Sequence, residues 1–233
     1  MQDTRIISVA TSMRHCLALS AEGEVYSWGD GACGELGHPD GHAVAGPRRI
    51  ATLERIESIA AGSEYTSAAV DDRGHLFTWD LAKIGCAPNG SLGYELDLGT
   101  ECQLTPKKVD TLSGDRVVGV AFGNGVTLGV TDAGAVFSFG VSAYGALVHG
   151  SSSACEMLPR RIEALTETGR RFVALAAGDN HSLMLAKDGQ VYGWGEGDAN
   201  GSGLVERNTP QRLTAFAGER VVLVHAQRYF SAP

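Results

Sequence analysis

Short apolar stretches separated by turns recur along the whole chain and predict β-strands. The clearest of them is a short strand that ends in an aromatic residue followed by glycine, as in residues 24–29, Glu-Val-Tyr-Ser-Trp-Gly. The segment returns three times, so that its aromatic residue stands at positions 28, 79, 139 and 194. The spacings of 51, 60 and 55 residues indicate an internal repeat.

Other features repeat in phase with the aromatic strand. A turn glycine comes before it in every copy, at positions 23, 74, 134 and 189. An apolar strand such as 182–185 precedes that turn, and a further strand such as 117–123 lies upstream. A proline-led segment follows the aromatic strand, at 47–50, 106–109, 159–162 and 210–213. Three or four short strands per period, without the 3.6-residue apolar pattern of a helix, predict an all-β protein: a β-propeller with one sheet per blade.

Composition narrows the class of protein. Glycine supplies 31 of the 233 residues, which fits a chain with many tight turns. The formal net charge of −8 argues against nucleic-acid partners and anionic membranes, because both require a basic surface. Five cysteines without a CxxC pair predict free thiols in a reducing compartment and no zinc site.

Targeting signals are not found in the sequence. No apolar run has the length of a membrane helix, and residues 1–7 do not read as a secretory signal. We therefore expect a cytoplasmic or nuclear protein without a bound cofactor or metal.

The first copy of the repeat resembles the repeats of the regulator of chromosome condensation family almost throughout. That family combines a His-containing Leu-Ala-Leu strand, a turn, Val-Tyr-x-Trp-Gly, Gly-x-Leu-Gly and a later proline. The matching positions here are His15, Leu17–Leu19, residues 25–29, residues 34–37 and Pro47. Later copies depart from the pattern at Tyr65, Asp80, Val126, Phe139 and Val148, and residues 201–204 form a stretched loop in the fourth.

Two other propeller families fit less well. Trp79-Asp80 is a WD dipeptide, but it occurs once, and the period exceeds that of WD repeats. A kelch period is closer in length, but no paired glycines recur at one place in each repeat.

The resemblance implies a propeller of seven blades when complete. We expect residues 1–233 to form one repeat domain of about four blades plus an extra strand, hence part of such a ring. The expected repeats span approximately 6–55, 56–116, 117–171 and 172–220, with the start of a fifth at 221–233. An open arc would leave unpaired strand edges that invite association.

Some motifs that serve catalysis or cofactor binding in other proteins are better explained here as parts of the repeat. Gly29–Gly34 matches GxGxxG, but it runs into a loop and not into the helix that a dinucleotide site needs. His15 and His181 share one repeat position beside an apolar strand, where we expect a structural hydrogen bond inside a blade. No serine or cysteine nucleophile motif is found, and we expect no enzymatic activity.

Paired basic residues recur at one repeat position, at 48–49, 107–108 and 160–161. Because neighbouring side chains in a strand point to opposite faces, only one of each pair would join a basic row. Salt bridges to nearby acids are the favoured interpretation, given the negative net charge.

The loop between the aromatic strand and the proline varies most in length, over residues 30–46, 81–105, 141–158 and 196–209. Insertions on a repeat scaffold often hold the function. The second loop is the longest, and its interior beyond Lys83 contains no basic residue. Its aromatic and acidic residues are the predicted partner-binding site, with a solvated surface loop as the alternative: Tyr94, Glu95, Asp97 and Glu101.

These observations favour a protein-interaction scaffold whose partner is another protein. The first copy is also similar to propellers in giant HECT-domain ubiquitin ligases, so the chain is expected to be a fragment of a larger regulatory or ubiquitin-ligase protein that recruits a ubiquitin-pathway substrate. The alternative implied by the resemblance is guanine-nucleotide exchange on a small Ran-like GTPase. A UV-sensing role, as in the related plant photoreceptor, is disfavoured because all three tryptophans serve the blade position.

Overall fold

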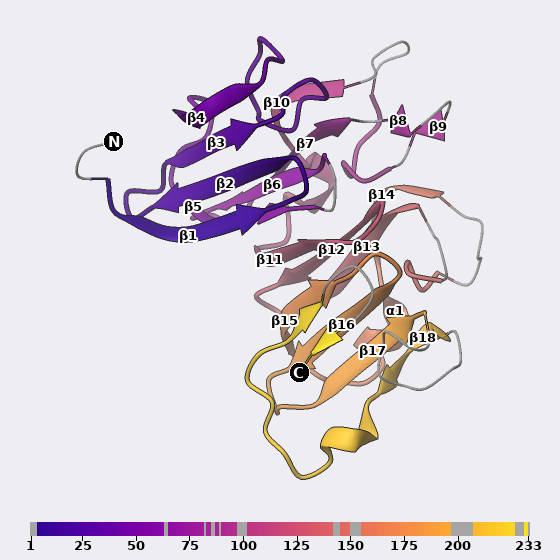
Figure 1. Cartoon of the computed structure of the whole chain (residues 1–233). Coiled ribbons are helices and arrows are strands. Elements are labelled where there is room, and N and C mark those ends of the chain that lie inside the picture. The colour runs from indigo at the N-terminus through magenta and orange to yellow at the C-terminus, as the bar shows by residue number, and fades with distance from the viewer. Residues whose placement is uncertain are drawn as a thin grey trace.

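The computed structural model describes residues 4–62, 65–81, 83–84, 87–88, 90–96, 102–141, 145–149, 155–196, 207–226 and 231–232. Within these ranges the chain forms four four-stranded antiparallel sheets, which succeed one another along an arc (Figure 1). The prediction of an all-β protein is confirmed.

Each sheet is built from one stretch of sequence. Sheet 1 contains β1 (Ile6–Thr11), β2 (His15–Ser20), β3 (Val25–Gly29) and β4 (Val44–Arg49). Sheet 2 contains β5 (Ile56–Ala61), β6 (Ser67–Asp71), β7 (Leu76–Leu81) and β10 (Cys102–Lys108). Sheet 3 contains β11 (Val117–Phe122), β12 (Val126–Thr131), β13 (Val136–Val141) and β14 (Cys155–Arg161). Sheet 4 contains β15 (Phe172–Ala177), β16 (His181–Ala186), β17 (Val191–Gly195) and β18 (Arg207–Arg212).

Minor elements accompany the four sheets. Two short hairpins pair β8 (Lys83–Ile84) with β9 (Ala87–Pro88), and β19 (His225–Ala226) with β20 (Ser231–Ala232). The helical turns are η1 (Asp110–Leu112), α1 (Glu163–Thr166) and η2 (Thr214–Phe216). The strand β19 follows sheet 4 in the position of a fifth first strand, because it lies beside β15.

The first strands of the sheets gather at the centre of the arc. Strand β5 lies beside both β1 and β11, and β15 lies beside β11. We call β1, β5, β11, β15 and β19 the inner strands. The other strands of each sheet extend outward from them in antiparallel order (Figure 1).

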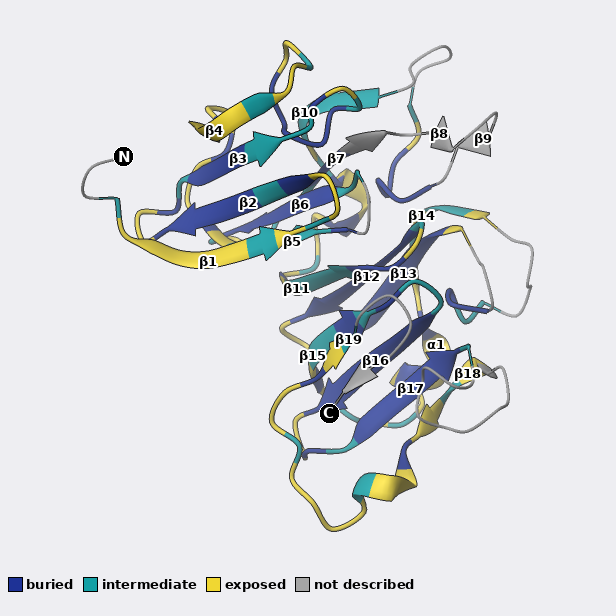
Figure 2. Ribbon diagram, viewed as in Figure 1, coloured by how far each residue is buried: buried dark blue, intermediate teal, exposed yellow. Residues whose placement is uncertain are grey.

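The hydrophobic core lies between neighbouring sheets. Second and third strands are buried along most of their length, because a sheet packs on each face; β12 and β16 are buried at every residue (Figure 2). Apolar side chains from two sheets therefore share one cluster, as Leu17 and Ile50 of sheet 1 do with Trp79 of sheet 2. Burial on both faces explains why these strands are apolar almost throughout.

A tight turn follows the third strand of each of the first three sheets, at residues 34–37, 90–93 and 145–148. We call it the glycine turn, because its first residue is a glycine with positive φ: Gly34 (93°), Gly90 (70°) and Gly145 (71°). A hydroxyl in the third strand donates a hydrogen bond to the carbonyl of the turn's third residue. The pairs are Ser27 with Leu36 (2.6 Å), Thr78 with Leu92 (2.7 Å) and Ser138 with Leu147 (2.7 Å).

The carbonyl of the turn's second residue joins its sheet to the next one. The Glu35 carbonyl of sheet 1 accepts hydrogen bonds from Ser67 Oγ (2.8 Å) and Trp79 Nε1 (2.9 Å) of sheet 2. We call this arrangement the joint. It explains the repeated tryptophan, whose ring fills the core while its N–H bonds to the preceding sheet.

The other two joints use one donor each among the hydrogen bonds of the described residues. Thr127 Oγ1 of sheet 3 donates to the Ser91 carbonyl at 2.7 Å, and Phe139 at the tryptophan position supplies no N–H. Trp194 Nε1 of sheet 4 donates to the Ala146 carbonyl at 2.8 Å.

The fourth residue of the glycine turn also has positive φ, at 74° for Gly37, 78° for Gly93 and 62° for Val148. A β-branched residue in this conformation costs about 1–2 kcal/mol. The departure of the third repeat from Gly-x-Leu-Gly therefore strains the backbone.

We expect Val148→Gly to raise the free energy of unfolding by about 1 kcal/mol, because relief of strain exceeds the loss of the valine's partial packing on the core. Thermal unfolding should show a Tm about 2–4 °C higher. The reverse change, Gly93→Val, is the control and should lower the Tm, since its Cβ would meet the Phe139 ring at 2.9 Å. A lower Tm for Val148→Gly would contradict the strain argument.

Candidate protein-interaction surface

The longest loops all lie at one end of the sheets. In an antiparallel sheet the first and third strands run the same way, so the segments that follow them lie at the same end. Backbone hydrogen bonds show this contact in three sheets: Asp30 N–H to the Arg14 carbonyl (2.9 Å), Val141 to Gly125 (2.8 Å) and Glu196 to Asn180 (2.8 Å). We call this the loop end; the opposite end, where the short 2–3 hairpins lie, is the turn end.

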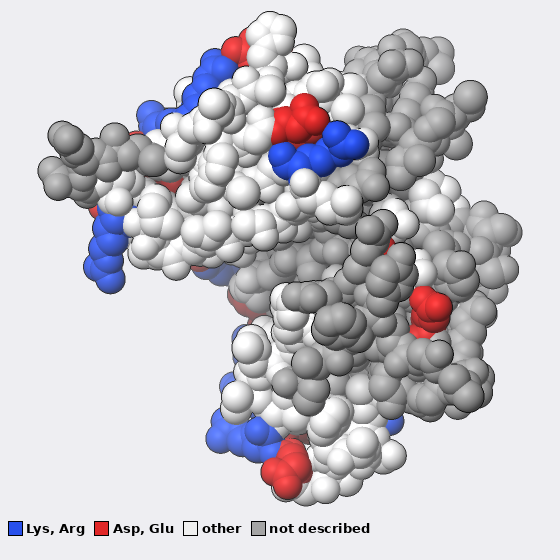
Figure 3. Space-filling view, in the orientation of Figure 1, with Lys and Arg blue, Asp and Glu red and all other residues white. Residues whose placement is uncertain are grey.

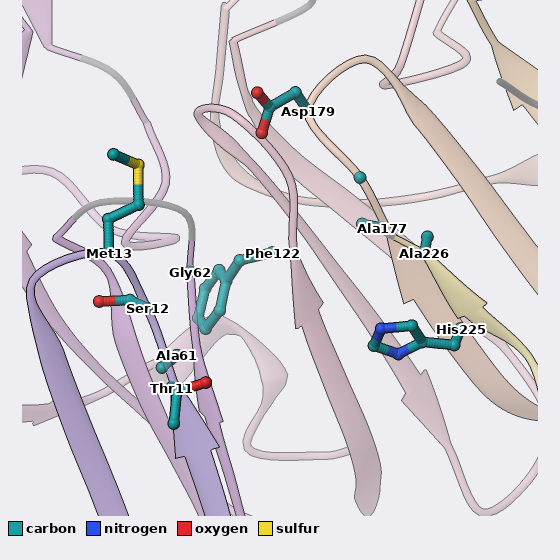
Figure 4. A pocket seen from close by; sticks show the side chains of 11 residues that line it. Thr11, Ser12, Met13, Ala61, Gly62, Phe122, Ala177, Asp179, His225 and Ala226 are labelled. Carbon is teal, nitrogen blue, oxygen red and sulfur yellow. The ribbon is translucent and has the colours of Figure 1, made fainter. Parts of the chain in front are cut away.

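A hollow of about 540 Å³ opens at the loop end, where the inner strands finish. Its walls come from all four sheets and from β19 (Figure 4). The lining residues are Thr11, Ser12, Met13, Ala61, Gly62, Phe122, Ala177, Gly178, Asp179, His225 and Ala226.

Side-chain size keeps this hollow open. The last residue of each inner strand is small except in β11, where Phe122 projects between the walls formed by Ala61 and Ala177 (Figure 4). Met13 is 66% exposed at one side, and Asp179 and His225 bring titratable groups to the other. A surface of small, apolar and a few polar groups suits contact with another molecule's side chains.

The hydroxyl of Ser12 and the ring of His15 make a short contact at the edge of the hollow, 2.8 Å between Oγ and Nδ1. His15 Nε2 lies 2.7 Å from Ser67 Oγ, which itself donates to the Glu35 carbonyl. Ser67 has one proton, which it donates to the Glu35 carbonyl, so Nε2 of His15 donates to Ser67 Oγ. His15 is therefore structural, as predicted, but its bond to Ser67 links two sheets where a bond inside one blade was expected.

His181 holds the same repeat position in sheet 4 and differs in its contacts. It is 1% exposed, and neither ring nitrogen has a hydrogen-bond partner among the described residues. Burial lowers its pKa against the opposing effect of Glu196 and Asp179. The ring is therefore neutral near pH 7, and no general base or metal ligand is assigned to it.

The structure describes two of the four residues predicted for partner binding, and these two differ in exposure. Tyr94 is 9% exposed: its hydroxyl donates to the Thr78 carbonyl at 2.9 Å, and Lys107 Nζ lies 4.5 Å from its ring centroid. Glu95, beside it, is exposed. Asp97 and Glu101 lie outside the described residues. The partner-contact role of this loop stays a prediction, with Glu95 as its accessible described member.

The basic pairs of the outer strands contact neighbouring acids and aromatic rings. Arg48 bonds Asp40 at 2.6 Å, and Arg160 bonds Glu156 at 2.8 Å. The second members of two pairs differ, since Arg49 meets Glu24 at 3.0 Å and Arg161 lies over the Phe137 ring. The predicted salt bridges are confirmed at Arg48, Arg49 and Arg160. Figure 3 shows blue and red side chains in small mixed groups.

Sequence reasoning missed a row of arginines at the turn end. An arginine stands immediately before β1, β5, β11 and β15, and a further one lies five residues before β19: Arg5, Arg55, Arg116, Arg171 and Arg220. Arg116 donates to the Asp72 carbonyl in the hairpin of the preceding sheet at 2.6 Å, and Arg171 donates to the equivalent Asp132 carbonyl. Aligning the residue before each inner strand would have revealed the row, whose observed contacts are structural.

The described residues contain neither a cluster of metal-binding side chains nor a helix that could cross a membrane. Among the residues that the structure describes, no three His, Cys, Asp or Glu side chains are arranged to hold a metal ion. Cys16 and Cys33 are free thiols, and Cys86 lies outside the described residues. Within the same ranges, no helix combines the length and apolar character needed to cross a membrane.

Comparison with known families and proteins identifies the same type of repeat that the sequence analysis predicts. A family model described as the regulator of chromosome condensation (RCC1) repeat matches residues 22–69 and 133–185, and a second model with that description matches 6–35 and 172–203. The human E3 ubiquitin-protein ligase HERC2 is 39% identical over 225 residues, 94% of this chain and 4% of the ligase. The ultraviolet-B receptor UVR8 of Arabidopsis thaliana is 36% identical over 194 residues, 82% of this chain and 41% of the receptor.

A solved structure extends the likeness to the fold. Prp20p from Saccharomyces cerevisiae superposes with a TM-score of 0.81 at 24% identity, over 99% of this chain and 56% of Prp20p. The likeness supports a β-propeller fold for the four sheets. The chain spans less than two thirds of each of these proteins.

A buried carboxyl in the first joint gives a pH-dependent test of the structure. Glu35 is fully buried; Oε2 accepts the Cys33 N–H at 2.8 Å, and Oε1 has no partner among the described residues. Burial raises the pKa of Glu35 above its ordinary value of 4.5. The folded state therefore holds this proton more tightly than the unfolded state, and stability falls as pH rises from 4.5 through the raised pKa.

We expect Glu35→Gln to raise the Tm by a few °C at neutral pH, because the amide removes an unpaired buried charge. The gain should shrink to near zero at pH 4, where Glu35 is protonated in both states. Calorimetry across this pH range measures the difference between the two proteins. The exposed Glu22→Gln is the matched control with no expected gain, and a gain for Glu35→Gln that does not vary with pH would refute the assignment.

Proposed function

Because this chain belongs to the family of RCC1 repeat proteins, we propose that it is a protein-interaction scaffold that binds another protein through its loop end. One observation carries the proposal: four repeats and β19 jointly form the hollow, and the loops of variable length begin at the same end. A partner at this end would contact several repeats at once, and the joints hold those repeats in fixed relation.

The second loop is part of this proposed interface. Tyr94 anchors the loop against sheet 2, so that Glu95 is presented at the surface, and the proposal extends the contact to Asp97 and Glu101. The sheets provide the rigid base, while the loops and the rim of the hollow provide specificity.

We also propose that the four sheets are four blades of a propeller that has seven when complete, and that the chain is a fragment of a larger regulatory or ubiquitin-ligase protein acting in the cytoplasm or nucleus. The likeness to HERC2 supports this, since the chain corresponds to 4% of that ligase. In such a protein this region would recruit a substrate or partner and perform no catalysis itself.

Two charge-introducing substitutions test the loop end. We expect Met13→Glu together with Glu95→Lys to reduce binding of the captured partners about tenfold or more, because both side chains are exposed on the proposed interface. Quantitative affinity capture from cells compares this variant with the original chain. Val118→Glu, at an exposed site on the turn end, is the control and should retain the partners. Equal loss in both variants, or none in either, would contradict the proposal.

Nucleotide exchange is the second candidate, favoured by the likeness to Prp20p, whose structure was described with its binding properties to Gsp1p and histones. The leading proposal predicts that the purified chain leaves the rate of GDP release from a Ran-type GTPase unchanged. Release of a fluorescent GDP analogue measures this rate, with EDTA as the positive control for release. An acceleration of about tenfold or more, lost in the Met13→Glu variant, would favour exchange instead.

A further inference from the structure

We propose that Cys33 and Cys102 form a reversible disulfide that locks the joint between sheets 1 and 2 when the protein meets a peroxide. Cys33 lies directly before the glycine turn of sheet 1, and Cys102 is the first residue of β10 in sheet 2. Neither cysteine lines the hollow, and the inference stands apart from the proposed scaffold function.

The backbones beside the two cysteines are in contact. A Cβ placed on Gly34 would lie 3.1 Å from the Gln103 carbonyl oxygen and 3.3 Å from the Leu104 Cα. The start of β10 therefore packs on the first residue of the glycine turn. Cys33 and Cys102 each come one residue before this contact in the sequence.

The equivalent contact between sheets 2 and 3 shows where a thiol at this position points. Cys155 begins β14 as Cys102 begins β10, and each is paired with the second residue after the aromatic position of its own sheet. The Cys155 Sγ lies 3.1 Å from the Cβ position of Gly90, the first residue of the second glycine turn. The same geometry directs the Cys102 side chain at the first glycine turn, beside Cys33.

Electrostatic coupling between the two thiols agrees with this placement. The pKa of the Cys33 thiol is raised to about 11, chiefly by burial and then by the negative charges of Glu35 and Cys102. Cys102 acts more strongly than Asp30, which is only three residues from Cys33 in the sequence. Because the interaction between charges weakens with distance, the Cys102 sulfur lies close to the Cys33 sulfur.

The surroundings disfavour charged sulfur and suit a neutral disulfide. Glu35 is fully buried beside Cys33, and its Oε2 accepts the Cys33 N–H at 2.8 Å. A thiolate at either cysteine adds negative charge near this carboxyl, whereas a disulfide carries no charge. The link would also close a long stretch of chain, residues 34–101, and so remove much conformational freedom from the unfolded state.

The reaction needs a two-electron oxidant, for which hydrogen peroxide is the probe. One thiolate attacks a peroxide oxygen and gives a sulfenic acid and hydroxide; the second thiolate attacks the sulfenic sulfur, forms the S–S bond and expels hydroxide. The two thiol protons join the two hydroxides, so that two thiols and one peroxide give one disulfide and two waters. The thiolate is the reactive form, and the raised pKa keeps the Cys33 thiol protonated near pH 7, so we expect a slow reaction that needs sustained oxidant.

The test oxidises the folded, unmodified chain with hydrogen peroxide, alkylates the remaining thiols and maps linked peptides by mass spectrometry without reduction. We expect most molecules to carry the link between Cys33 and Cys102. Cys155 should form no link within the chain, because asparagine stands directly before Gly90 where a partner cysteine would be needed.

Thermal unfolding measures whether the link holds the joint. The Tm should rise by about 5 °C or more on oxidation and return to its starting value with dithiothreitol. Cys33→Ser and Cys102→Ser should each abolish both the link and the rise. Cys155→Ser is the matched control and should keep both.

Three results would overturn the proposal. Cys33 and Cys102 that stay unlinked when the exposed Cys155 has been oxidised would show that their sulfurs do not meet. A link from Cys102 to Cys86, or from either cysteine to a second molecule, would assign the oxidation to other pairs. A linked chain with an unchanged Tm would show that the bond does not hold the joint. None of these results bears on the comparison of loop-end and turn-end variants, so the two proposals fail separately.

Discussion

A hydrogen bond to one backbone carbonyl, at the second position of each glycine turn, fixes how neighbouring sheets sit on one another. Burial of apolar side chains between sheets is strong but has no direction, so it alone would let the sheets slide. The carbonyl is buried by that packing and must be paired, which the next sheet achieves with a hydroxyl, an indole N–H or both. The hollow and the neighbouring loops keep their relative positions because these contacts recur at every joint.

The repeat, the all-β class and the strands could all be predicted from the sequence, since short apolar segments, turn glycines and aromatic spacing are local signals. The joint could not be predicted, because its acceptor is a backbone carbonyl that any residue carries: Glu35, Ser91 and Ala146 have nothing in common as side chains. Tyr94 illustrates a related limit. An aromatic residue in an acidic loop suggests an exposed contact, yet its hydroxyl donates inward to Thr78. Only the folded chain shows that acceptor.

The two ends of the molecule differ in how much the lengths of their connecting segments vary. At the turn end, hairpins are short and an arginine precedes each inner strand, as Arg116 does where it holds the Asp72 carbonyl. At the loop end, segments of very different length leave the same scaffold. In each of the first three sheets, a hydroxyl of the third strand ties the glycine turn of the loop to its own sheet, whatever the length of the loop. A binding surface can therefore change in this family without disturbing the core.

Hydrogen bonds across the joints are distributed unevenly along the arc. Between sheets 1 and 2 three converge on Ser67 and the Glu35 carbonyl, whereas one is observed at each later joint in the described residues. In an array where each unit touches only its neighbours, stability is a sum of such local terms. Local unfolding should therefore reach the first joint later than the glycine turns beyond it. At the turn end, the contact of Arg116 with the Asp72 carbonyl joins sheets 2 and 3 independently of the joints.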